Sequence, residues 1–216
     1  MPNYSKKPLL TATDEEYTML IEVSEEFEKQ KIDKATREKY GSPAEIVLRN
    51  HLLRRNLKIS LIEGVTIEGS KIKIGLLFLK NGVDPNQTMY LPSQVKMAIE
   101  VKNNAVAGKP LKNEKPLDPN KVLRAKFNEL EAITNVRNFA VVVLSEMLLP
   151  PKTPYKWRFR GEKIGKENCK VFTLVARQLY PPGGLYIKSN IEEMLRKGQM
   201  KKTGEFQELI KYLQCL

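Results

Sequence analysis

The chain has 216 residues, of which 41% are hydrophobic and 29% are charged, as is typical of a globular protein with a sizeable core. Its longest apolar runs, such as FAVVVL at 139–144, have the length of a strand and are too short to cross a bilayer. The net charge of +12 favours a polyanionic partner, nucleic acid before anionic membrane, over a simple role in solubility.

Taken from its N-terminus, the chain begins without a basic-then-apolar signal segment, so we expect a cytoplasmic protein with no membrane partner. An acidic helix is predicted over 14–28, where apolar residues recur at helical spacing. A second helix is predicted from Ser42 to about Arg55. Ser42 is its N-cap, Pro43 lies in its first turn, and Glu45 is placed to complete a capping box.

Two strands are predicted next, at 58–67 and 71–80, joined by a tight turn. With a two-residue turn, Leu61 lies opposite Phe78, and one face of this hairpin is apolar. A third strand begins at Val95 after a polar loop. Its apolar residues alternate with polar ones, so that the side chains of residues 96, 98, 100 and 102 point to one face.

The next elements predict a parallel crossover. Asp118-Pro119 begins a helix in which apolar residues recur at helical spacing, and NFAVVVL at 138–144 is apolar on both sides, as expected of a central strand. Strand, helix and strand in this order predict a right-handed connection. The C-terminal third adds YKWRFR, a strand at KVFTLVA and two closing helices from about residue 190.

The order helix, hairpin, third strand ending in IEVK, helix and apolar strand resembles the PD-(D/E)XK nuclease superfamily over about residues 42–145. The resemblance implies an α/β fold with a restriction-endonuclease-like core, a mixed central sheet of αβββαβ order flanked by helices. An N-terminal helix precedes this core and a C-terminal α+β extension at 151–216 follows it. We expect residues 1–216 to form a single nuclease-like domain.

The same resemblance implies the roles of three consecutive residues. Glu100 would be a metal ligand, the carbonyl of Val101 a second ligand, and Lys102 the group that activates or positions water at the scissile phosphate. The implied cofactor is Mg²⁺, with Mn²⁺ as an alternative, because hard cations take carboxylate and carbonyl oxygens. The alternative is an exposed Glu100–Lys102 ion pair of little energetic weight.

Glu45 resembles the acidic residue that many members carry on the helix before the sheet, and it is the third catalytic candidate. Its capping box alone would also explain a glutamate at this position. The family further carries an aspartate on the second strand, and the aligned residue here is Gly75. Neither Asp84 nor Glu68 is placed to substitute for it, so the sequence also allows a degenerate site.

Basic residues near these motifs are candidates for nucleic-acid binding. In PYKWRFR, aromatic and cationic residues alternate, so that a strand would place its rings in the core and Lys156, Arg158 and Arg160 on a phosphate backbone. Lys71 and Lys73 on the predicted second strand extend the basic surface. The expected partner is double-stranded DNA, bound by a homodimer, because cleavage of both strands by single-domain members requires two sites.

Three functions follow in order of preference. The first is a Mg²⁺-dependent DNA endonuclease, most simply of the restriction type. The second is a catalytically degenerate nuclease-fold protein that binds DNA, which Gly75 favours. The third is a basic RNA-binding protein in which Glu100 and Lys102 are only surface charges.

Overall fold

A computed structural model describes residues 14–32, 42–60, 65–104, 118–147, 161–179, 181 and 185–216. The helices are α1 (Glu15–Ile32), α3 (Pro43–Arg54), α4 (Pro119–Thr134), α5 (Gly161–Ile164), α6 (Lys188–Arg196) and α7 (Glu205–Gln214), with a 3₁₀ helix η1 (Pro92–Gln94). The strands are β1 (Thr66–Ile67), β2 (Leu76–Leu79), β3 (Met89–Tyr90), β4 (Val95–Asn104), β5 (Phe139–Met147), β6 (Cys169–Arg177) and β7 (Met200–Lys202).

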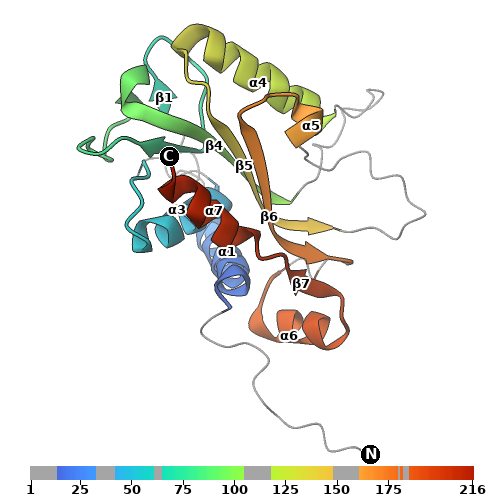
Figure 1. Ribbon diagram of the computed structural model, residues 1–216. Helices are drawn as coiled ribbons and strands as arrows, with labels where there is room; N and C mark the ends of the chain where they lie inside the picture. Colours follow the sequence, from blue (N-terminus) through green and yellow to red (C-terminus); the bar gives the residue numbers. More distant parts are fainter. Residues whose placement is uncertain are drawn as a thin grey trace, which may run out of the picture.

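A five-stranded mixed sheet of order β2-β4-β5-β6-β7 forms the centre of the molecule (Figure 1). Strand β2 is antiparallel to β4, the strands β4, β5 and β6 are parallel, and β7 is antiparallel to β6. The prediction that the third and fourth strands are adjacent and parallel is therefore confirmed. The α/β class is confirmed as well.

The predicted hairpin at 58–67 and 71–80 is only partly correct. Of its second strand, only Leu76–Leu79 belongs to the central sheet, and Phe78 lies opposite Ile59. Leu61, the predicted partner of Phe78, lies outside the described residues. Residues 66–67 instead pair in parallel with β3 in a separate two-stranded sheet. This non-local pairing has no local signature in the sequence, which explains why the prediction missed it. The predicted pairing of Val65 with Ile74 is confirmed as an isolated antiparallel bridge.

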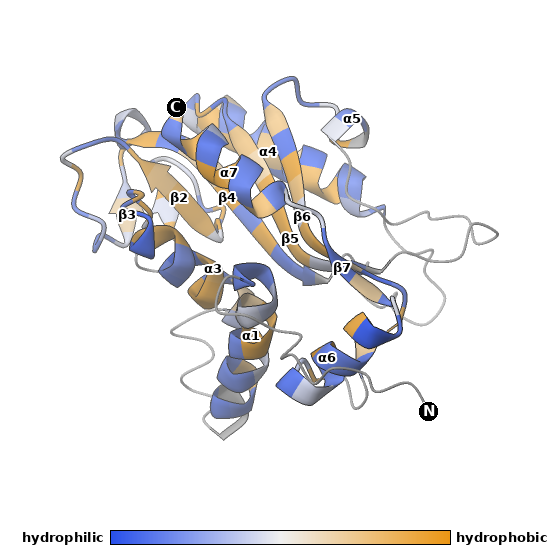
Figure 2. Ribbon diagram, turned by 60° about the horizontal axis from the view of Figure 1, so that its bottom comes forward, coloured by the Kyte–Doolittle hydropathy of each residue, from blue (hydrophilic) through white to orange (hydrophobic). Residues whose placement is uncertain are grey.

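Helices cover both faces of the central sheet (Figure 1). One face packs against α1, α3, α6 and α7 in a cluster that contains Leu20, Leu48, Met97, Ile191 and Phe206. The opposite face packs against α4 and α5 in a second cluster. Figure 2 shows this division, with hydrophobic colour concentrated on the central strands and hydrophilic colour on the outer sides of the helices.

Two helix starts follow the predicted capping chemistry. The Ser42 side chain accepts a hydrogen bond from the Glu45 N–H at 3.4 Å, and the Glu45 carboxylate accepts one from the Ser42 N–H at 3.3 Å. This reciprocal pair is the predicted capping box of α3. At the start of α4, the Asp118 carboxylate accepts from the Asn120 N–H at 3.0 Å.

The C-terminal part of the chain completes the central sheet. KVFTLVA lies in β6, as predicted, and the closing helices are α6 and α7, with the short strand β7 between them. The strand predicted at YKWRFR lies outside the described residues. Among the described residues, no helix has the length and apolar character needed to span a membrane.

Candidate active site

Glu100 lies on β4 with its side chain only 8% exposed, and each of its carboxylate oxygens is bonded to a lysine. Lys102 donates to Oε1 at 2.6 Å, and Lys126 donates to Oε2 at 2.6 Å. The sequence therefore correctly predicted that Glu100 and Lys102 lie together. The alternative of an exposed ion pair is wrong, because the carboxylate is buried and shared by two cations.

Lys126 comes from α4 and is not among the site residues predicted from the sequence. The buried face of α4 is formed by Leu123, Phe127 and Leu130, and Lys126 lies at its margin with 25% of its side chain exposed. A signal for this placement exists. A crossover helix after a strand covers one face of the sheet, and a lysine three residues after Leu123 and four before Leu130 points toward that face.

Glu45 fills the space that a side chain at position 75 would occupy. A Cβ atom on Gly75 would lie 2.5 Å from Glu45 Oε1 and 3.1 Å from its Cδ. Leu76 pairs with Ile99, so Gly75, one residue before Leu76, lies beside Glu100, one residue after Ile99. The carboxylate of α3 thus occupies the space of a side chain at position 75, on the strand segment next to Glu100.

The two carboxyl groups have opposite pKa shifts. Burial raises the pKa of Glu45 and the negative charge of Glu100 raises it further, against the hydrogen bonds from Ser42 and the charge of Lys102. Burial also opposes ionisation of Glu100, but the charges and hydrogen bonds of Lys102 and Lys126 outweigh it and hold its pKa below the ordinary value. Glu100 therefore ionises at a lower pH than Glu45 does.

Glu45 and Glu100 supply the hard oxygen donors that Mg²⁺ or Mn²⁺ would take in this site. Mg²⁺ is commonly held by one or two carboxylates together with water and phosphate oxygens, so this donor set fits. Val101, the other predicted ligand, has its side chain in the core on the opposite face, which leaves its carbonyl as the relevant group. Within the described ranges, no three His, Cys, Asp or Glu side chains gather as a metal-binding group.

The remaining predicted residues lie at or beyond the margin of this site. Lys71 and Lys73 are exposed on the segment that leads to Gly75. Asp84 is exposed and accepts a hydrogen bond from the Asn86 N–H, and Glu68 is exposed beyond β1. The predicted DNA-binding residues Lys156, Arg158 and Arg160 lie outside the described part of the chain.

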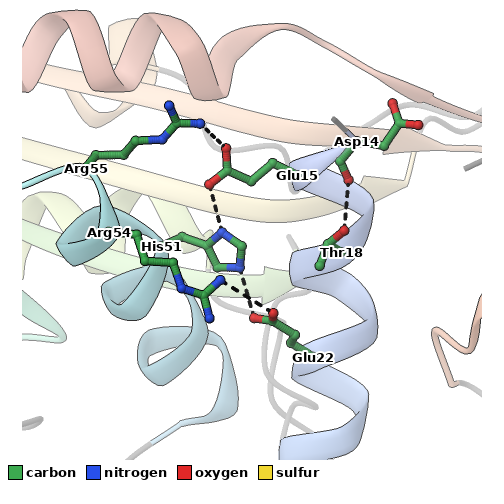
Figure 3. A network of polar contacts seen from close by, with 7 residues as sticks. All are labelled: Asp14, Glu15, Thr18, Glu22, His51, Arg54 and Arg55. Carbon is green, nitrogen blue, oxygen red and sulfur yellow. Dashed lines mark hydrogen bonds and ion pairs between the residues drawn. The ribbon is translucent and has the colours of Figure 1, made fainter. Parts of the chain in front are cut away.

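A polar network fixes α3, and with it Glu45, to α1 (Figure 3). His51 is buried between two carboxylates of α1. Its Nδ1 lies 2.8 Å from Glu15 and its Nε2 lies 2.9 Å from Glu22. Arg55 also donates to Glu15, at 2.5 Å. Each ring nitrogen thus contacts a carboxylate of α1, and His51 links the two helices.

Comparison of the chain with protein-family models, curated proteins and solved structures gives no match. The arrangement of Glu45, Glu100, Lys102 and Lys126 therefore carries the functional argument.

Proposed function

We propose that the chain is a metal-dependent endonuclease that hydrolyses phosphodiester bonds in double-stranded DNA. In this proposal the central sheet is a restriction-endonuclease-like core of the PD-(D/E)XK type. The observation that carries it is the contact between Gly75 and Glu45. A carboxylate occupies the space of the missing aspartate side chain, beside Glu100 and its lysine partner.

The topology supports the same proposal. Strand β2 is antiparallel to β4, and β4 is followed by the helix α4 and the adjacent parallel strand β5. This is the order implied by the family resemblance for the second, third and fourth strands. Glu100 lies in β4, the third strand of the predicted order, and Glu45 lies on the helix before the sheet, as the resemblance implies.

The chemistry assigns a role to each residue. Hydrolysis forms a bond from a water oxygen to phosphorus and breaks the bond to the leaving oxygen, which takes a proton. Glu45 and Glu100 would hold Mg²⁺ or Mn²⁺, which when bound stabilises negative charge on the phosphate and lowers the pKa of water. Lys102 donates to a phosphate oxygen or orients the attacking water.

The proposed partner is a DNA duplex bound by a homodimer, since each strand of the duplex requires its own site. The net charge of +12 supports a polyanionic substrate, because binding to phosphates releases counterions.

The proposal is tested by incubating the protein with supercoiled, linear and branched DNA, with Mg²⁺, with Mn²⁺ or with a chelator. We expect cleavage only with metal. Glu100→Gln should abolish cleavage and weaken metal binding, because it removes the ionised ligand. Lys102→Ala should abolish cleavage but retain binding of metal and DNA. Full cleavage by both variants would exclude this site.

A second function, DNA binding without cleavage, is favoured by one observation. Both Glu100 oxygens are bonded to ammonium groups, which a metal would have to displace. Tight DNA binding by a wild-type protein that cuts no DNA with either metal would support this second function.

A further inference from the structure

Lys126 is a second cation on Glu100 that the proposed function does not use. Its Nζ lies 2.6 Å from Oε2, while Lys102 already bonds Oε1 at the same distance. One ammonium group is enough to balance one carboxylate. The second ammonium group has a different effect on the site. With it, the charges of Glu45, Glu100, Lys102 and Lys126 sum to zero when all four are ionised.

The helix that carries Lys126 is firmly held. Phe127 stacks on Phe139 of β5 with ring centroids 4.5 Å apart, and Arg124 donates to the carbonyl of Ile164 at 2.5 Å. Farther along the helix, Glu131 pairs with Lys166. The backbone at Lys126 is therefore fixed, while its long and partly exposed side chain is free to change rotamer.

The two lysines differ in their surroundings. Lys102 lies on β4 itself, two residues from Glu100, and bonds Oε1. Lys126 reaches Glu100 from α4 and bonds the other oxygen, so its ammonium group can leave while Lys102 still balances the carboxylate.

We infer that the Lys126 ammonium group bonds the Glu100 carboxylate in the metal-free protein and competes there with the divalent cation. When that cation binds, the ammonium group is released toward the substrate phosphate. This inference rests on the proposed function. A divalent cation entering a site of zero net charge gains little attraction, and it meets an ammonium group on the oxygen it must take. A DNA phosphate offers this ammonium group another partner, so binding of DNA would favour binding of metal.

The inference is tested by titrating the free protein with Mn²⁺ and following the unbound ion by electron paramagnetic resonance. Lys126→Met should bind Mn²⁺ about tenfold more tightly than wild type, because the competing charged hydrogen bond is gone. Lys126→Arg keeps the competing cation and should bind as wild type does. Lys121→Met is the matched control, because it removes the same charge from an exposed position on α4.

The outcomes separate this inference from the proposed function. Equal or weaker Mn²⁺ binding by Lys126→Met overturns the inference, and Lys126→Gln repeats the test if the first variant does not fold. Binding by Lys126→Met when wild type binds no Mn²⁺ would support it strongly. If wild type and Glu100→Gln bind Mn²⁺ equally well, the metal site itself is wrong, and the proposed function fails with it.

Discussion

At the scale of single residues, the burial of Glu100 is costly and has no evident structural benefit. Taking a carboxylate out of water costs several kcal/mol, and two partly exposed lysines offset this by charge and hydrogen bonding. Replacing such a group by an apolar residue is often neutral or even stabilising. A buried charge held by two elements is thus weak evidence for stability, whereas the proposed metal site gives it a role.

His51 provides a residue-scale prediction on stability. Its ring is 3% exposed and contacts two acidic residues of α1, so His51→Ala leaves a cavity and removes a polar partner from each. We expect a loss of about 2–3 kcal/mol at neutral pH, measured by urea unfolding. Arg54→Ala is the control. Arg54 lies 3.8 Å from Glu22 but is 63% exposed, so its loss should cost less than about 1 kcal/mol.

The pH dependence of this loss follows from Glu15. Burial opposes ionisation of Glu15, but hydrogen bonds from His51 and Arg55 outweigh it, and its pKa lies below the ordinary 4.5. Because the pKa of Glu15 is lower in the folded than in the unfolded state, its ionisation stabilises the fold when the pH is above the unfolded-state pKa. This stabilisation is lost as the pH falls through the folded-state pKa. The difference between wild type and His51→Ala should therefore shrink from about pH 6 to about pH 3. A constant difference would show that Glu15 is not involved.

At the scale of elements, the contact between Glu45 of α3 and Gly75, the residue before β2, predicts that the carboxylate can be moved from one to the other. Gly75→Asp alone should displace Glu45, because even a Cβ atom at position 75 lies 2.5 Å from its Oε1. Gly75→Asp combined with Glu45→Gln moves the carboxylate from position 45 on α3 to position 75, just before β2. Glutamine also completes a capping box, so α3 keeps its N-terminus. Glu45→Gln alone should weaken Mn²⁺ binding. We expect the double variant to bind Mn²⁺ about tenfold or more tightly than Glu45→Gln does.

The control for the exchange is Gly75→Ala with Glu45→Gln, which fills the same space but supplies no carboxylate. It should bind Mn²⁺ no better than Glu45→Gln. Equal recovery in both double variants would mean that packing, and not a ligand, explains why position 75 is glycine.

The elements that the sequence predicted well are those with local signals. The capping box of α3, the alternation along β4 and the apolar run of β5 each depend on residues close together in the chain, and all three elements form as predicted. The pairing of β1 with β3 depends on residues more than twenty positions apart, and no local pattern encodes it.

The same distinction explains the site. Glu100 and Lys102 are neighbours on one strand face, so alternation alone brought them together. The capping box accounted for Glu45, but its contact with Gly75 depends on how α3 meets β2. Lys126 required the position of α4 over the sheet. The sequence can indicate that Lys126 faces the sheet, but which side chain it meets there depends on the packing of α4.

At the scale of the whole molecule, charge is distributed unevenly. Six of the residues of α1 are glutamate, whereas the segment before β2 exposes Lys71 and Lys73 two to four residues from Gly75. If the proposed site meets a phosphate backbone, DNA approaches this basic side and avoids the acidic helix.

This distribution predicts which lysines determine the salt dependence of DNA binding. Each phosphate contact contributes roughly 0.9 to the slope of log affinity against log salt, so removal of both Lys71 and Lys73 should reduce the slope by up to about 2. Lys29→Ala, at a residue 72% exposed on α1, should leave it unchanged. The slopes are measured by fluorescence anisotropy with a labelled duplex and no metal. The triple alanine variant of Lys156, Arg158 and Arg160 should reduce the slope as well, if that segment contacts the backbone. Equal slopes for wild type and the Lys71 and Lys73 variant would place the duplex elsewhere, because a lysine that contacts no phosphate releases no counterion.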